Sequence, residues 1–159
     1  MTSLARKLVA YREYHHDPRN VMTHAVGIPM IVLAITTLLA RPVFEIGGMA
    51  LTPAIIVAAL AAAWYVQLDV RMGLVMTALL ALFVVAGGML GTLPTPIRLG
   101  AGIALFVVGW IFQLVGHKFE GRKPAFVDDL RSLLVGPLFV VVEGLFALGL
   151  LKGLRREMG

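Results

Sequence analysis

The sequence predicts an all-α fold, a polytopic membrane bundle of about five hydrophobic helices with four or five crossings, behind an N-terminal interfacial amphipathic helix. Of the 159 residues, 59% are hydrophobic and only 14% are charged, whereas soluble domains carry about 25% charged residues. Five long stretches lack charged residues and histidine, apart from one glutamate, and each approaches the roughly 20 apolar residues of a spanning helix. They leave no room for a soluble domain, so we expect a single membrane domain over residues 1–159.

The N-terminal segment is expected to form the amphipathic helix over residues 2–14. Leu4, Leu8 and Tyr11 repeat at helical spacing beside basic residues, a pattern typical of helices that lie in the membrane interface.

The first apolar stretch covers residues 25–40. Asp17 and Pro18 form a helix N-cap followed by a first-turn proline, so the first long helix should begin at Pro18. Pro29 lies inside it and should kink the helix next to His24.

The other four apolar stretches complete the expected bundle, and they cover residues 46–68, 72–97, 99–116 and 132–151. Glycine and proline in residues 91–96 should separate the third helix from the fourth. A short amphipathic stretch should begin at Pro124, and Gly136 and Pro137 should disturb the start of the fifth helix.

The basic residues predict the orientation in the membrane. Four of the 14 Lys and Arg precede the first helix, four lie in the fourth loop, and each of the other three loops has one. We therefore expect a multi-pass protein of the cell inner (plasma) membrane, with the N-terminus and the fourth loop cytoplasmic. The three basic residues after the fifth helix fit a re-entrant or strongly tilted helix better than a crossing one.

The composition also excludes several classes of function. The net charge of +5 accompanies long apolar segments, so it indicates membrane anchoring rather than a nucleic-acid partner. The chain has no cysteine, which excludes disulfides, iron–sulfur clusters and thiol catalysis.

Histidines are concentrated in one part of the predicted topology. The chain has four, of which His15, His16 and His24 fall within ten residues, and His117 is expected at the same membrane face. Imidazole is the commonest metal ligand in proteins, and Glu120 follows His117 by one helical turn as a candidate carboxylate ligand. The pattern favours a metal site at the cytoplasmic rim over histidines that only contact lipid headgroups, although the adjacent His15 and His16 point apart in most geometries.

Two motifs identify a resemblance to a known family. Residues 11–24 read YREYHHDPRNVMTH and are followed by Gly27, Ile28 and Pro29, and residues 113–120 read QLVGHKFE. The sequence RKPA at residues 122–125 and GPLF at residues 136–139, with Glu143 behind it, continue the second motif. Nearly the whole chain resembles the fungal 2-hydroxy-palmitate dioxygenase family, which also has many bacterial members.

The resemblance implies an iron(II)-dependent dioxygenase. The implied reaction is α-oxidation of a 2-hydroxy fatty acid to the acid one carbon shorter, with loss of carbon dioxide. The motif histidines that the resemblance implies as iron ligands and catalytic residues are His15, His16, His24 and His117. Iron of this kind takes two or three histidines with one carboxylate and keeps open positions, so Glu120 is the expected carboxylate.

The implied substrate suits the rest of the chain. A 2-hydroxy acid can chelate iron through its hydroxyl and its carboxylate and leave a position for oxygen, while its acyl chain lies among the helices and membrane lipid. Five polar residues near the same rim are candidates for binding the substrate headgroup: Arg19, Asn20, Lys118, Arg122 and Lys123.

Three alternatives remain open at this point. His24 and His117 could be the axial ligands of a haem. A small transporter or proton relay could use Glu143, because a charge inside an apolar helix is expensive and often functional. A scaffold without chemistry is the third alternative, and the histidine cluster is the main observation against it.

Overall fold

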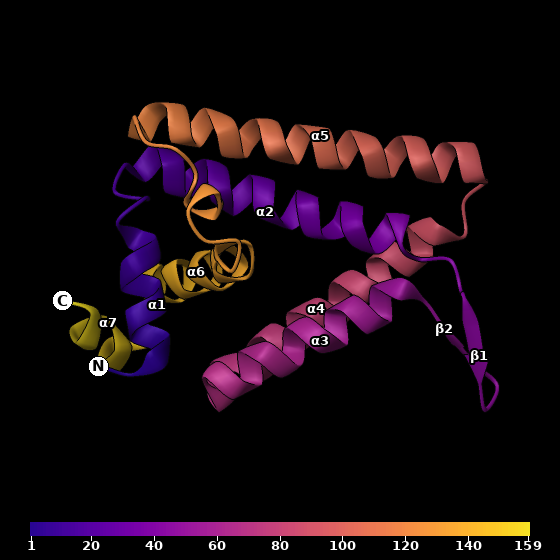
Figure 1. Cartoon of the computed structure of the whole chain (residues 1–159), viewed down its shortest axis with the longest axis horizontal. Helices are drawn as coiled ribbons and strands as arrows, with labels where there is room; N and C mark the ends of the chain where they lie inside the picture. Colours follow the sequence, from indigo (N-terminus) through magenta and orange to yellow (C-terminus); the bar gives the residue numbers. More distant parts are fainter. The chain divides into compact units, whose positions relative to one another are not determined.

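Helices dominate the protein in a computed structural model that describes residues 1–159, with the side chain of Met49 excepted (Figure 1). The helices are α1 (Ser3–Arg12), α2 (Pro18–Leu38), α3 (Pro53–Leu68), α4 (Val70–Gly91), α5 (Thr95–Glu120), α6 (Ser132–Ala147) and α7 (Lys152–Met158). A two-stranded antiparallel hairpin, β1 (Phe44–Ile46) and β2 (Met49–Leu51), and a 3-10 turn, η1 (Ala125–Val127), complete the described elements. The predicted all-α membrane helix bundle is confirmed.

Three helices are long and apolar enough to cross a membrane. They are α2, α4 and α5, with 21, 22 and 26 residues. The helices α6 and α7 reach that length only as a pair that is bent by 115°, which makes four candidate spans at most. A further apolar helix, α3, has 16 residues and is shorter than the three candidate spans. These helices indicate a membrane protein, and its orientation stays a prediction.

The chain forms two compact units. The first contains residues 1–28 and 110–159, and the second contains residues 29–109. Part of α2 and part of α5 belong to each unit. The boundary within α2 falls at Pro29, where the helix lacks one hydrogen bond because the ring nitrogen of proline cannot donate. The single membrane domain over residues 1–159 stays a prediction.

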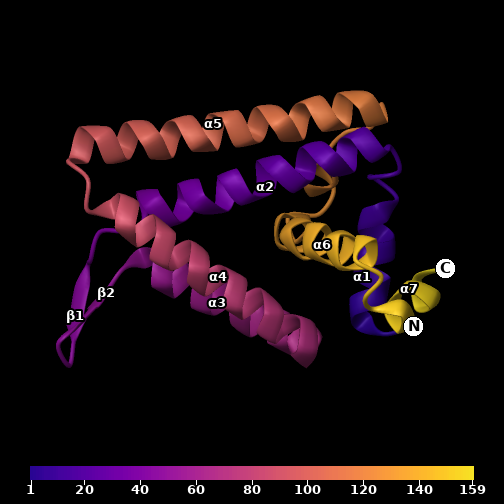
Figure 2. The ribbon, with the colours of Figure 1, turned by 180° about the vertical axis from the view of Figure 1, so that it is seen from behind.

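In the second unit, α3 and α4 pack side by side as a helical hairpin (Figures 1 and 2). Asp69 alone joins them, and its carboxylate accepts a hydrogen bond from Met72 N at 2.8 Å to cap α4. Gly73 allows the close approach, because a Cβ there would lie 2.6 Å from Val66 N. The buried Arg98 of α5 donates to the carbonyl of Leu38 at 2.9 Å and caps the end of α2.

Two expected boundaries in this unit were wrong. Residues 46–52 belong to the hairpin and its exit rather than to a helix, because Gly47 and Gly48 adopt φ values of 58° and 80° and turn the chain. The helix α5 begins at Thr95 rather than at residue 99, so Arg98 lies inside a helix and not in a loop.

In the first unit, α1 packs against α6 and α7. The predicted apolar stripe of Leu4, Leu8 and Tyr11 is buried in these contacts. Arg12 donates to the carbonyl of Met158 at 2.7 Å, and both chain ends lie beside α1 and α7 (Figure 2). The bend between α6 and α7 thus brings the basic C-terminal residues next to α1, and whether the fifth apolar stretch crosses the membrane or re-enters it stays a prediction.

Candidate metal centre

Three of the four histidines meet inside the first unit. His15 lies in the turn between α1 and α2, His24 lies on α2, and His117 lies on α5. One ring nitrogen from each lies within 4.8 Å of the other two. The three residues are 2%, 2% and 6% exposed. Side chains that are far apart in sequence therefore form a compact, buried triad of nitrogen donors.

Backbone carbonyls determine which nitrogens of the triad carry protons. His15 Nδ1 donates to the carbonyl of Tyr11 at 2.9 Å, and His24 Nδ1 donates to the carbonyl of Asn20 at 2.9 Å. A carbonyl can only accept, so in each neutral ring the proton is on Nδ1 and the lone pair is on Nε2. Such carbonyl contacts orient metal-binding histidines in proteins.

The two free lone pairs face one another. His15 Nε2 and His24 Nε2 are 3.1 Å apart, and they cannot form a hydrogen bond with each other when both rings are neutral. Burial lowers the pKa of His15 to about 4, so a proton does not bridge the pair at pH 7. A metal held at about 2.1 Å, with angles of roughly 90–110°, places two ligand nitrogens about 3.0–3.4 Å apart. The residues present therefore fit a metal ion.

Local sequence explains how the rings come together. The Tyr11 and His15 rings stack at 4.1 Å with an interplanar angle of 10°, because hydrogen bonds from Tyr14 N to the carbonyl of Tyr11 and from His15 N to the carbonyl of Arg12 continue the end of α1 as a tight turn. Gly116 brings α5 close to α2 beside His117: a Cβ there would collide with Asn20 Oδ1 and approach His24 Nδ1 to 3.2 Å. The glycine thus sets the spacing of the two helices at the triad.

Glu120 binds backbone amides instead of joining the triad. Its Oε1 accepts from His16 N at 2.8 Å, and its Oε2 accepts from Asp17 N at 2.9 Å and from Asn20 Nδ2 at 3.0 Å. These donors lie at the start of α2, where helical N–H groups lack partners. Glu120 therefore anchors the turn that carries His15 to the end of α5.

His16 also lies outside the triad. Its side chain is exposed, and its Nε2 lies 3.7 Å from Glu13 Oε2. Of the four predicted histidine ligands, the structure brings three together and leaves His16 at the surface.

Of the five residues predicted to bind the substrate headgroup, Asn20 contacts the triad, because its carbonyl accepts from His24 Nδ1. Arg19 pairs with Asp17 at 2.7 Å, and Lys123 pairs with Asp128. Asn20 is fully buried, and its amide donates to the carbonyl of Tyr14 as well as to Glu120. The other two candidates are Lys118, which is exposed, and Arg122, which donates to the carbonyl of Glu13 and lies over the Tyr14 ring.

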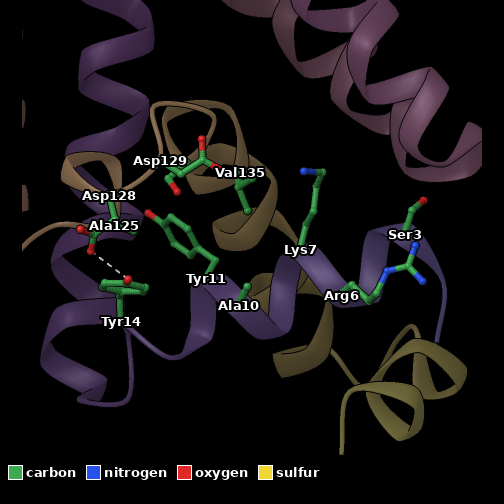
Figure 3. A pocket seen from close by; sticks show the side chains of 11 residues that line it. Ser3, Arg6, Lys7, Ala10, Tyr11, Tyr14, Ala125, Asp128, Asp129 and Val135 are labelled. Atoms are coloured by element: carbon green, nitrogen blue, oxygen red, sulfur yellow. Dashed lines mark hydrogen bonds between the residues drawn. The ribbon is translucent and has the colours of Figure 1, made fainter.

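Tyr11 connects the triad to a cavity that the sequence analysis missed. Its ring stacks on His15 and also lines a cavity of about 460 Å³ between α1 and the segment from η1 to α6 (Figure 3). Arg6 and Lys7 line one side, and Asp128 and Asp129 line the other. Burial raises the pKa of Tyr11, so its hydroxyl stays protonated. In the sequence, the one indication that Tyr11 contacts the triad is its position four residues before His15.

The geometry is also relevant to two alternative functions, a haem protein and a proton relay. The ring centroids of His15, His24 and His117 are 4.5–5.0 Å apart in all three pairs, which leaves no space between His24 and His117 for the flat ring of a haem. Glu143 is half-buried on α6 and makes no hydrogen bond or ion pair with another described residue. A proton relay would need a partner group there.

The fold and the site together define a helical membrane protein with a buried triad of histidines suited to a metal ion. Residues 1–148 match the family described as 2-hydroxy-palmitic acid dioxygenase Mpo1-like, and the chain belongs to that family. It is 34% identical over 161 residues to the 2-hydroxy-palmitic acid dioxygenase MPO1 of Saccharomyces cerevisiae, which covers 99% of this chain and 88% of the yeast protein. No solved structure matches the chain. The resemblance seen in the two motifs is confirmed.

Proposed function

We propose that the protein is an iron(II)-dependent dioxygenase that converts a 2-hydroxy fatty acid to the fatty acid one carbon shorter. The observation that carries the proposal is the pair of unprotonated Nε2 atoms of His15 and His24 at 3.1 Å, with His117 beside them. The family of the chain supports the substrate class.

The proposed reaction balances without any further reductant. One 2-hydroxy acid and one oxygen molecule give one shortened acid, one carbon dioxide and one water. The bond between the carboxyl carbon and the hydroxyl-bearing carbon breaks, and the latter becomes the new carboxyl carbon. The protein therefore has to bind a metal, the acid and oxygen, but no nucleotide or second organic substrate.

The triad residues have distinct tasks in this proposal. Bound iron(II) would supply open coordination positions and the redox chemistry that oxygen requires. His15, His24 and His117 hold the ion, and the carbonyls of Tyr11 and Asn20 keep two of the rings in the correct tautomer. His16 is exposed and is not one of the proposed iron ligands, although it is the neighbour of His15 in the turn before α2.

The surroundings of the triad suit a lipid-like substrate. The site is formed by the first turns of α2 and the last turns of α5, two helices long and apolar enough to span a bilayer. We place these ends at the cytoplasmic face of the cell membrane, where an acid can present its headgroup to the triad while its acyl chain stays in lipid. Glu120, with both oxygens occupied by N–H donors, acts as a positioning residue.

Oxygen uptake tests the proposal. Purified protein reconstituted with iron(II) should consume oxygen when given 2-hydroxyhexadecanoic acid and should release pentadecanoic acid and carbon dioxide in equal amounts. Hexadecanoic acid should be inert because it lacks the second chelating oxygen. A chelator should stop the reaction, and iron should restore it better than zinc, which has no redox chemistry. Activity that survives complete metal removal would contradict the proposal.

A further inference from the structure

Gln113 is a buried polar side chain on α5, as Arg98 and His117 are, but it takes no part in the triad. Gln113 is 6% exposed, and its Nε2 has no hydrogen-bond partner among the described residues. Buried amide groups are nearly always paired, because an unpaired donor loses its bonds to water without replacement. A ligand that is bound during function can supply the missing acceptor.

Gln113 belongs to the face of α5 that forms the triad. In the last turns of this helix, Gln113, Gly116 and His117 are buried. The residues between and beside them are exposed: Leu114, Val115, Lys118 and Phe119. Gly116 faces Asn20 and His24 across the helix contact, so the buried stripe is directed at the start of α2.

The direction of helical side chains brings Gln113 and His117 together. They are four residues apart, and such side chains are neighbours on a helix surface. Because side chains on a helix lean toward its N-terminus, the ring of His117 leans over the turn that carries Gln113. Gln113 thus lies one helical turn farther than His117 from the C-terminal end of α5, toward the apolar middle of the helix.

Other polar atoms around the triad are also unpaired. His117 Nδ1 and Asn20 Oδ1 are buried and have no partner among the described residues. Together with Gln113 Nε2, they provide both donor and acceptor capacity on the buried sides of α5 and α2. This distribution complements a ligand that itself both donates and accepts hydrogen bonds.

We propose that the side-chain amide of Gln113 hydrogen-bonds the 2-hydroxyl group of the acid held at the triad and makes the site selective for 2-hydroxy acids. This inference rests on the proposed function. A hydroxyl group both donates and accepts, as a neutral amide does, whereas a carboxylate only accepts. A site whose polar groups hydrogen-bond a substrate hydroxyl rejects an analogue that lacks this hydroxyl, because the polar groups of the site then stay unpaired.

The test compares two acids on the metal-loaded full-length protein. Wild type, Gln113→Met and Gln67→Met are loaded with cobalt(II), and the visible absorption of the cobalt reports binding of 2-hydroxyhexadecanoic acid and hexadecanoic acid. Methionine keeps the length of glutamine but has no amide. Gln67, the other glutamine of the chain, is exposed on α3 and provides the matched control.

We expect Gln113→Met to bind the 2-hydroxy acid about tenfold more weakly than wild type, with unchanged affinity for hexadecanoic acid, while Gln67→Met behaves as wild type. An unchanged ratio of the two affinities, or an equal loss for both acids, would overturn the role of Gln113. Gln113→Leu gives the same comparison if the methionine variant does not fold. Failure of wild type to bind cobalt or iron would instead overturn the proposed function and this inference with it.

Discussion

Replacing Gly116 with alanine tests whether the contact between α2 and α5 builds the metal site. The added Cβ would collide with Thr23 Oγ1 and Asn20 Oδ1 and would lie 3.2 Å from His24 Nδ1. The clash can be relieved only if the helices separate or if these side chains, including the carbonyl-oriented ring of His24, move. Overpacking of this kind costs about 1–3 kcal/mol, against a gain of about 1 kcal/mol from the helix propensity of alanine.

The net change in the free energy of unfolding should therefore be small, about 0–2 kcal/mol. Metal affinity should fall by more, about 10–100-fold, because displaced ligands no longer meet in one coordination shell. Competition with a chromogenic chelator measures the affinity, and thermal unfolding in detergent measures the stability.

Gly100→Ala is the matched control on the same helix, since nothing lies within 4 Å of a Cβ at Gly100. It should leave metal affinity unchanged and stabilise the helix slightly. A folded Gly116→Ala protein that binds metal as tightly as wild type would refute the inferred contact.

Five further substitutions distinguish metal ligands from the residues around them. His24→Ala and His117→Ala should each abolish metal binding in an equilibrium dialysis assay, whereas His16→Ala should keep the metal and lower turnover only in part; full metal binding by either triad variant would exclude it as a ligand. Glu120→Ala leaves two backbone N–H groups without their acceptor and should lower the melting temperature, with a free-energy cost of about 0.5–1.5 kcal/mol, and weaken metal binding; an unchanged melting temperature would argue against the anchoring role. Glu143→Gln should keep near-normal activity, because the carboxyl has no ionic partner among the described residues; complete loss of turnover in a folded protein would show that its ionisation matters.

Local signals in the sequence predict much of the fold. The cap and proline at residues 17 and 18 correctly mark the start of α2, and the charge-free stretches mark the long helices. The hairpin at residues 44–51 was missed, because hydropathy does not distinguish an apolar strand from an apolar helix. The glycine pair at residues 47 and 48, placed between two apolar runs, is the signal that predicts a turn there.

The candidate site could be predicted only in part. The histidine count and the two motifs indicate which rings are candidates, and three of them meet in the structure. The choice between His15 and His16 depends on the stacking of Tyr11, and the position of Glu120 depends on amides about 100 residues away in sequence. Contacts between residues so far apart produce no periodic pattern in the sequence. The sequence therefore could not show that the Glu120 carboxylate accepts hydrogen bonds at the start of α2.

The iron content of the protein tests the central claim most directly. Protein reconstituted with iron(II) without oxygen, and then freed of unbound metal, should contain one iron atom per chain by elemental analysis. A variant in which His15, His24 and His117 are all replaced by alanine, but which remains folded, should contain none. Wild-type protein that retains no iron, or a triple variant that retains as much as wild type, would contradict a triad that holds the metal.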